Sequence, residues 1–107
     1  MLDYEILPAD AVRLLRDQSA RLIDVREPWE FALTRIEGSV PIPMSEIPSR
    51  AAQELNRDER LIIVCHHGVR SMNVTAWLRK QGFEQAQSLR GGTDAWSQEV
   101  DLTVSRY

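Results

Sequence analysis

LIIVC, residues 61–65, is the most strand-like run in the chain, and HHGVRS, residues 66–71, follows it directly. The first run is apolar throughout and rich in β-branched side chains. Such a run is typical of a central parallel strand that is covered on both faces. Ligands of parallel α/β sheets bind beyond the carboxyl ends of the strands. We therefore expect residues 66–71 to lie at a ligand site.

Four other runs are predicted to be strands, with decreasing strength. Residues 21–25 (RLIDV) read as a buried strand, and residues 86–89 (AQSL) do so more weakly. Residues 39–42 and residues 4–6 are weaker still. Pro41 and Pro43 confine the former to an edge of the sheet, because proline cannot donate a ladder hydrogen bond.

Between these runs, apolar residues recur at helical spacing. Pro8 suits the first turn of one helix, and Ser45 is the expected N-cap of a second. A third helix starts near Ser71 and ends before Gly82, which suits the left-handed position after a helix. Shorter helices are expected at residues 28–33 and 93–99. The alternation predicts an α/β fold with a small, mainly parallel sheet flanked by helices on both faces.

The chain has 107 residues, which predicts one domain, residues 1–107, since a domain takes about 150 residues. Cys65 is the only cysteine, so an intramolecular disulfide is excluded. The acidic N-terminal stretch does not have the pattern of a signal peptide. No apolar run approaches the roughly 18 residues that span a bilayer. We expect a cytoplasmic protein that does not engage a membrane.

The net charge of −3 argues against nucleic acid as a partner, because binding phosphates requires a basic face. Residues 60–83 nevertheless contain four cations and no acid. This segment forms either a positive surface around one helix or a local attraction for a small anion. Composition alone does not choose between the two.

The loop after the strand offers the Cys65 thiol an environment that favours negative charge. A loop that closes onto a helix start turns several backbone N–H groups inward. Gly68 allows a backbone geometry that other residues resist, and Arg70, expected in a solvent-facing loop, adds a permanent cation. The dipole of the helix is too weak to ionise a thiol alone, since a helix end contributes only about 0.3–1 kcal/mol. The prediction therefore requires the amides of the loop to face the sulfur.

The same loop has two other interpretations. A lone cysteine that closes an apolar strand is often an inert core residue, but a core cysteine does not require the polar, cationic residues that follow. His66 and His67 could instead be zinc ligands. Adjacent residues rarely converge on one ion, and no second ligand pair with suitable spacing exists in the sequence. We therefore expect no metal.

Three motifs stand in order along the chain: LIDVRE (residues 22–27), continuing through WEF (29–31) and IEGS (36–39), then Cys65-x-x-Gly68-x-Arg70-Ser71, then RGGTDAW (90–96). On these motifs the sequence resembles the rhodanese-like domains, the thiosulfate and persulfide sulfurtransferases, in their single-domain form. The resemblance extends from about residue 6 to residue 96. It implies the rhodanese-like version of the α/β fold.

The resemblance also implies a mechanism. Cys65 would take the outer sulfur from a small anionic donor such as thiosulfate, or from a protein persulfide, and become a persulfide itself. It would pass this sulfur to cyanide, a thiol or a thiocarboxylate carrier, without a cofactor. Asp24 and Arg26 resemble residues that brace the loop, and a surface ion pair is the alternative. The anionic sulfur would be held by the backbone amides of His66, His67, Gly68, Val69, Arg70 and Ser71.

The sequence departs from the family pattern at Thr34-Arg35, where members often have Gly-His, so any role of that histidine cannot be carried over. The ending, residues 99–107, resembles tails of single-domain relatives, and we infer no activity from it. Two other functions remain open. The first is a cysteine phosphatase or arsenate reductase. Tyrosine phosphatase loops have five residues between cysteine and arginine, whereas this loop has four, and the narrower ring fits one sulfur and crowds a phosphate. A non-catalytic binding module is the second alternative, because a fold does not determine a function.

Overall fold

The computed structural model describes residues 2–107, and it contains a five-stranded sheet in which every pair of neighbouring strands is parallel. The strand order is β1-β5-β4-β2-β3. The apolar run of residues 61–65 supplies the middle strand, as predicted. The strands are β1 (Glu5–Ile6), β2 (Arg21–Asp24), β3 (Val40–Pro41), β4 (Leu61–Val64) and β5 (Ala86–Leu89).

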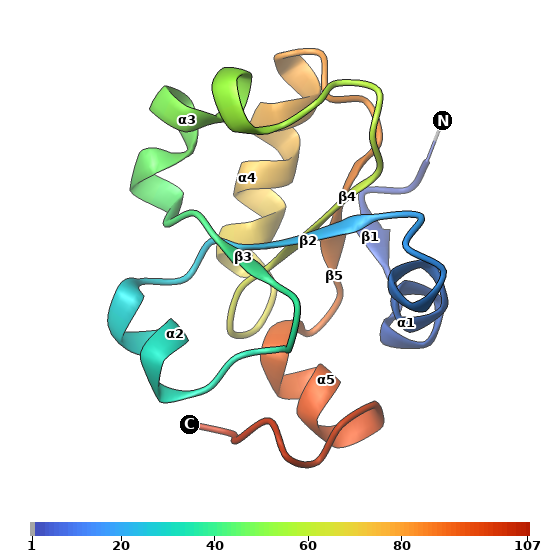
Figure 1. Ribbon diagram of the computed structural model, residues 1–107, viewed down its shortest axis with the longest axis vertical. Coiled ribbons are helices and arrows are strands. Elements are labelled where there is room, and N and C mark those ends of the chain that lie inside the picture. The colour runs from blue at the N-terminus through green and yellow to red at the C-terminus, as the bar shows by residue number, and fades with distance from the viewer. Residues whose placement is uncertain (1) are drawn as a thin grey trace.

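Helices cover both faces of this sheet (Figure 1). One apolar core joins the sheet to α3 and α4, and a second joins it to α1 and α5. Side chains of β4 alternate between them, since Ile63 belongs to the first core and Ile62 to the second. The helices are α1 (Pro8–Arg16), α2 (Pro28–Leu33), the short 3₁₀ turn η1 (Met44–Glu46), α3 (Ile47–Glu54), α4 (Val69–Lys80) and α5 (Gly92–Glu99). The predicted fold class is confirmed.

Two predicted helix starts are wrong. Ser45 is not an N-cap: it lies within η1, and α3 begins at Ile47 with Pro48 in its first turn, where proline is favoured. The helix expected from Ser71 begins two residues earlier, at Val69, because Gly68 reverses the chain in a left-handed conformation. Gly82 does take the left-handed position beyond the end of α4, as expected.

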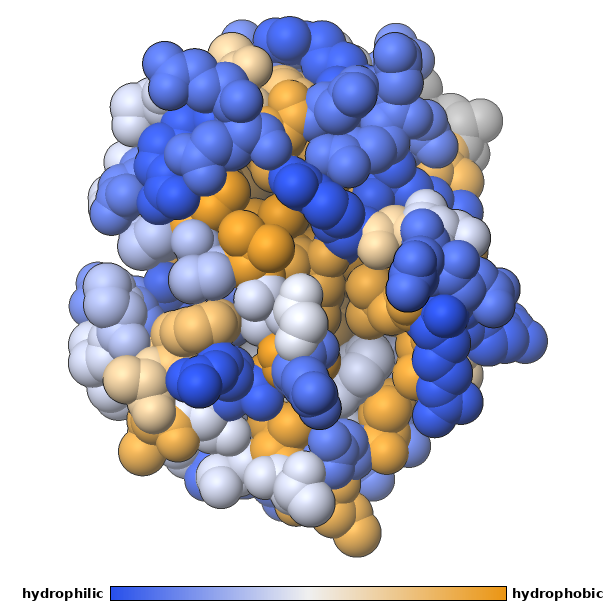
Figure 2. Space-filling model, viewed as in Figure 1, coloured by the Kyte–Doolittle hydropathy of each residue, from blue (hydrophilic) through white to orange (hydrophobic). Residues whose placement is uncertain are grey.

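Because all strands are parallel, their carboxyl ends share one edge of the sheet. Residues 65–68 leave β4 at this edge, α2 follows β2 there, and the chain end returns to it beside α2 (Figure 1). Apolar side chains are also exposed between α3 and α4, where they line an open pocket of about 150 Å³ (Figure 2). None of the helices in residues 2–107 has the length and hydrophobicity that crossing a membrane requires.

Candidate active site

The turn between β4 and α4 depends on Gly68, whose φ of +107° lies in the left-handed region. A Cβ at this position would lie 3.4 Å from the backbone nitrogen of Gly91, the residue that precedes α5. The turn is therefore closed by backbone geometry that favours glycine. As a result, the amides of the loop point back toward Cys65.

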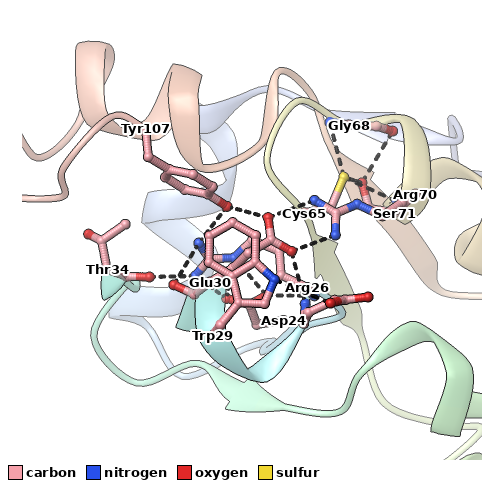
Figure 3. A network of polar contacts seen from close by, with 11 residues as sticks. Asp24, Arg26, Trp29, Glu30, Thr34, Cys65, Gly68, Arg70, Ser71 and Tyr107 are labelled. Atoms are coloured by element: carbon pink, nitrogen blue, oxygen red, sulfur yellow. Dashed lines mark hydrogen bonds and ion pairs between the residues drawn. The ribbon is translucent and has the colours of Figure 1, made fainter. Parts of the chain in front are cut away.

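Two of these amides reach the sulfur. The N–H of Gly68 donates to Cys65 Sγ at 3.1 Å, and the N–H of Ser71 donates to it at 3.3 Å (Figure 3). Both donors favour a negative charge on the sulfur. We call residues 65–71, with these two amides facing Sγ, the sulfur cradle. The N–H groups of Val69 and Arg70 have no hydrogen-bond partner within residues 2–107.

Two carbonyl groups of the cradle, those of Cys65 and His66, point the other way, toward the start of α5. The N–H of Thr93 donates to the oxygen of Cys65 at 2.8 Å, and that of Asp94 donates to the oxygen of His66 at 3.1 Å. Gly92 allows this approach, because a Cβ there would lie 2.3 Å from both carbonyl oxygens. The α5 N-terminus thus fixes the loop from behind while the amides of Gly68 and Ser71 face the sulfur.

A buried pair of hydroxyl groups adjoins the sulfur. Ser71 Oγ lies 3.4 Å from Cys65 Sγ and 2.7 Å from Oγ of Ser88 on β5. Within residues 2–107, Ser88 Oγ has no other partner, so its proton is satisfied only by donating to Ser71. The Cys65 thiol donates to Ser71 Oγ, which leaves the Ser71 proton for the Gly68 oxygen, 3.3 Å away. Once Cys65 is a thiolate, the same proton is available to the sulfur. Sequence reasoning missed Ser88, since nothing in the AQSL run marks a polar role.

Cys65 itself is 1% exposed. The sequence argument required the loop amides to face the sulfur, and those of Gly68 and Ser71 do. The thiol is nevertheless covered by the fold.

Arg70 differs from the expected solvent-facing cation. Its side chain is 32% exposed, and it binds Glu30 of α2 through Nη1 to Oε1 at 2.6 Å and Nη2 to Oε2 at 2.9 Å. This pairing raises the pKa of Arg70. It also lowers the pKa of the Glu30 carboxyl from an ordinary 4.5 to about 2, with the Arg70 hydrogen bonds as the largest cause. The cation at the site is therefore already neutralised by a buried carboxylate.

Asp24 and Arg26 form a buried pair, with the Arg26 side chain 0% exposed, so the alternative of a surface ion pair is wrong. Arg26 Nη2 donates to Asp24 Oδ2 at 2.7 Å. Arg26 also donates to two backbone carbonyl oxygens, that of Glu30 on α2 and that of Thr34 just beyond α2. The pair therefore contacts α2 rather than the cysteine loop. It reaches the cradle through Glu30 and Arg70 and, by way of Tyr107, through His66.

Tyr107 connects these groups from the end of the chain (Figure 3). Its hydroxyl donates to Glu30 Oε2 at 2.7 Å and accepts from Arg26 Nη1 at 2.9 Å. We call Asp24, Arg26, Glu30, Arg70 and Tyr107 the side-chain network. Sequence reasoning missed two of its members. A glutamate three residues after a helix N-cap is a recognisable capping signal for Glu30, but no pattern marked Tyr107.

His66 and His67 lie on the outer side of the loop. The His66 ring stacks on Tyr107, with centroids 3.8 Å apart and planes at 7°. Burial, followed by the neighbouring His67, lowers the pKa of His66. The two histidines and Asp94 place one possible ligand atom each within 4.8 Å of the others. Asp94 is already bound to Arg106 at 2.8 Å, and we assign no metal to this group.

The basic segment at residues 60–83 does not form one anion-attracting surface. Arg60 donates to the side chain of Gln87, and Arg79 donates to the backbone carbonyl oxygens of Leu2 and Asp3. These contacts lie near the beginnings of the strands, at the opposite edge of the sheet from Cys65. Of the arginines in the segment, Arg70 alone lies at the cradle.

Known proteins share this combination of a parallel sheet and flanking helices. The model of the family described as Rhodanese-like domain matches residues 7–99. The chain belongs to this family, as the sequence motifs predicted.

Curated relatives include thiosulfate sulfurtransferases. The thiosulfate sulfurtransferase GlpE of Pseudomonas fluorescens is 34% identical over 90% of this chain and 87% of its own. The protein of the same name from Pseudomonas aeruginosa is 35% identical over 87% of this chain and 84% of its own.

Solved structures agree in fold. A rhodanese-related protein from Thermoplasma volcanium superposes with a TM-score of 0.82 at 30% identity, covering 92% of this chain and 94% of its own. A rhodanese-like domain protein from Staphylococcus aureus gives 0.82 at 31% identity, covering 92% and 95%.

Proposed function

We propose that this protein is a sulfurtransferase that carries a sulfane sulfur on Cys65. The observation that supports this most is the pair of N–H donors, from Gly68 and Ser71, directed at Cys65 Sγ. Hydrogen bonds to an ionised acceptor are about twice as strong as neutral ones, so the cradle favours the thiolate, which is the nucleophilic form. The curated relatives named for thiosulfate sulfurtransfer agree with this chemistry.

The proposed reaction has two half-reactions. In the first, the Cys65 thiolate attacks the outer sulfur of thiosulfate, an S–S bond forms to Cys65, and the donor's S–S bond breaks to release sulfite with the bonding electron pair. In the second, an acceptor nucleophile attacks the terminal sulfur, and the thiolate of Cys65 leaves. With cyanide as acceptor the product is thiocyanate, and with a thiol it is a new persulfide. No electrons are gained or lost overall, and no cofactor takes part.

The remaining groups of the cradle have roles in this proposal. The unpaired amides of Val69 and Arg70 would bind the terminal sulfur or the donor's oxygens. Arg70 would orient the anionic donor with the guanidinium N–H groups that Glu30 leaves free. His66, His67 and Ser71 line the loop, and Asp24 and Arg26 hold α2 so that Glu30 stays in place. A protein persulfide is the proposed alternative donor, and a thiol or thiocarboxylate the acceptor.

The test is intact-mass spectrometry after incubation with thiosulfate and, separately, with a small-molecule persulfide. We expect a gain of one sulfur atom that cyanide removes as thiocyanate. Cys65→Ala should gain none, and wild-type protein alkylated at Cys65 should gain none either, which controls for a folding defect in the variant. If the wild-type protein gains sulfur from neither donor, the proposal is rejected and a binding module is favoured.

The phosphatase alternative has its own test. It requires turnover of a generic aryl phosphate that Cys65→Ser abolishes. The short loop, with four residues between Cys65 and Arg70, argues against it, because a tetrahedral phosphate needs a wider ring of amides. Turnover that depends on Cys65 would overturn the sulfurtransferase proposal in favour of phosphoryl chemistry.

A further inference from the structure

The C-terminal segment, residues 100–107, lies beyond the part of the chain that the family model matches. After α5 it crosses the carboxyl edge of the sheet and returns beside α2 (Figure 1). Burial of Val104 in the second core and two polar contacts set its path. The N–H of Ser105 donates to Thr34 Oγ1 at 2.9 Å, and Arg106 Nε donates to Asp94 Oδ1 at 2.8 Å. Thr34 is one of the two positions where the sequence departs from the family pattern, and here its hydroxyl anchors this segment.

The direction of the hydrogen bonds at Tyr107 follows from the chemistry of its partners. A guanidinium only donates and an ionised carboxylate only accepts. Tyr107 must therefore accept from Arg26 and donate its single proton to Glu30 Oε2. Burial is the main cause of a raised pKa of Tyr107, so the phenol keeps this proton at neutral pH. The hydroxyl thus links two groups that are ionised at that pH.

This hydroxyl completes the set of donors around Glu30. Oε1 accepts from Arg70 Nη1 at 2.6 Å and from the N–H of Glu27 at 3.0 Å. Oε2 accepts from Arg70 Nη2 at 2.9 Å and from Tyr107 at 2.7 Å. Each oxygen is therefore held by Arg70 and by one further donor. Removal of the Tyr107 donor frees Oε2 to move with Arg70.

The Tyr107 ring makes a second connection to the loop. It stacks on His66, the residue directly after Cys65, and its edge meets Trp29, with centroids 6.2 Å apart and planes at 75°. Tyr107 thus contacts both the outer side of the loop, through its ring, and the carboxylate that holds Arg70, through its hydroxyl.

We propose that Tyr107 is a positioning residue for sulfur transfer: through Glu30 and His66 it fixes Arg70 and the start of the loop in the orientation that receives an anionic donor. The proposal rests on the proposed function. It assigns the C-terminal segment a part in the donor half-reaction, although the segment contributes no group that touches the reacting sulfur.

The test uses the separation of the two half-reactions. In a ping-pong mechanism, kcat/KM for the donor and kcat/KM for the acceptor report different steps. We expect Tyr107→Phe, which keeps the ring and removes the hydroxyl, to lower kcat/KM for thiosulfate about fivefold, consistent with partial loss of a hydrogen bond to a charged group. The value for an uncharged thiol such as dithiothreitol should not change. Tyr4→Phe is the matched control, because Tyr4 is about half-exposed at the far edge of the sheet.

A double-mutant cycle tests whether the effect passes through Arg70. In the Arg70→Ala background, Tyr107→Phe should have no further effect on the thiosulfate step. Independent, multiplicative effects would overturn the proposal, and so would equal losses in both half-reactions, since these would indicate a general structural defect.

The ring has a separate readout in the titration of His66 followed by NMR. The groups that face His66 are His67, Asp94, Glu30 and Arg70, together with Tyr107 itself. Tyr107→Ala exposes the imidazole and should raise its pKa, whereas Tyr107→Phe keeps the stacking and should leave it nearly unchanged. Identical titrations of wild type and Tyr107→Ala would contradict the ring contact.

Failure of this inference can be told from failure of the proposed function. If the wild-type protein acquires sulfur on Cys65 while Tyr107→Phe behaves as wild type, only the role of Tyr107 is rejected. If the wild-type protein acquires no sulfur from either donor, the proposed function is rejected first.

Discussion

The sulfur cradle and the side-chain network meet at Arg70, but they depend on the sequence in different ways. The cradle consists of seven consecutive residues and holds the sulfur with main-chain N–H groups from Gly68 and Ser71. The network joins side chains from β2, α2, α4 and the chain end, and the contact between Tyr107 and Arg26 spans 81 positions. The first is therefore specified locally by a motif, whereas the second exists only once the fold has formed.

This difference predicts where substitutions act. Changes in the network should reduce stability first, because it buries charges that depend on one another. Changes in the cradle should reduce sulfur transfer more than stability, because its donors belong to the main chain and few side chains can remove them.

The largest expected effect on stability is that of Asp24→Asn. It leaves the Arg26 guanidinium, 0% exposed, without its charged partner. Breaking a buried ion pair in this way typically costs about 3–5 kcal/mol in the free energy of unfolding. Urea unfolding monitored by tryptophan fluorescence measures this loss.

Glu54→Gln is the matched control, since it removes an exposed carboxylate that is also paired with an arginine, Arg50. We expect little change from it, because exposed ion pairs contribute little to stability. Similar losses for the two variants would show that burial of the Asp24 pair is unimportant.

Glu30→Gln should have a somewhat smaller, pH-dependent effect. The pKa of Glu30 falls from 4.5 to about 2 in the folded protein, chiefly through the Arg70 hydrogen bonds. A lowered carboxyl pKa stabilises the folded state above pH 4.5, and this contribution is lost as the pH falls toward 2. At pH 7 it corresponds to roughly 3 kcal/mol.

Unfolding free energies of wild type and Glu30→Gln, measured from pH 7 downward, check this expectation. The difference between them should be largest at pH 7 and should shrink as the solution is acidified below pH 4.5. A difference that stays constant over this range would mean that Glu30 does not contribute through its charge.

The sequence predicted that amides of the loop face the sulfur, as those of Gly68 and Ser71 do, but it predicted the network poorly, for physical reasons. A strand, a glycine and a helix start are local features, so the direction of the amides could be inferred from residues 61–71. The partners of Arg70 could not be inferred, because a guanidinium can pair with any carboxylate that the fold brings near, and the chain contains 16 acidic residues. The same reason explains why Arg70, expected to face solvent, is instead paired with Glu30, since the order of charges along the chain does not give their arrangement in space.

The boundaries of helices were predicted less well than their existence. Residues 28–33 form a helix as expected, because Pro28 starts it and Glu30 caps it. The start of α4 was misplaced because Gly68 supplies no capping side chain and acts only through its backbone. Tyr107 lies in a stretch without periodicity. Its position depends on Val104, which is buried in the second core, and on Thr34 and Asp94, which hold the segment before it.

Gly92→Ala tests the support behind the cradle. The new Cβ would lie 2.3 Å from the carbonyl oxygens of Cys65 and His66, so the loop must shift. Gly38 is the matched control: it also has a positive φ, of +86°, but nothing lies within 4 Å of the Cβ that alanine would add. Both variants bear the left-handed strain, and only Gly92→Ala adds a clash.

We expect Gly92→Ala to be less stable than Gly38→Ala by about 2 kcal/mol, a typical penalty for overpacking. It should also slow sulfur uptake by Cys65, measured as the rate of mass gain from thiosulfate, whereas Gly38→Ala should not. Equal uptake by the two variants would indicate that the start of α5 does not hold the loop in its active shape.

The smallest effect is expected for Ser88→Ala, which alters the cradle without touching its main chain. Ser88 Oγ donates to Ser71 Oγ at 2.7 Å and so leaves the Ser71 proton available to Cys65 Sγ, 3.4 Å away. Without Ser88, Ser71 Oγ loses the donor that polarises its hydroxyl, so the hydrogen bond from Ser71 to the sulfur becomes weaker.

Such a loss corresponds to about 0.5–1 kcal/mol, or roughly a threefold slower uptake of sulfur. Ser97→Ala is the matched control, because Ser97 is also a buried serine but lies on α5. It should leave the uptake rate unchanged. Since Ser71 is poised between Cys65 and Ser88, a slower rate in Ser88→Ala but not in Ser97→Ala means that a side chain on β5 tunes a site otherwise made of backbone amides. If both variants transfer sulfur at the wild-type rate, the two amides of Gly68 and Ser71 suffice to stabilise the thiolate.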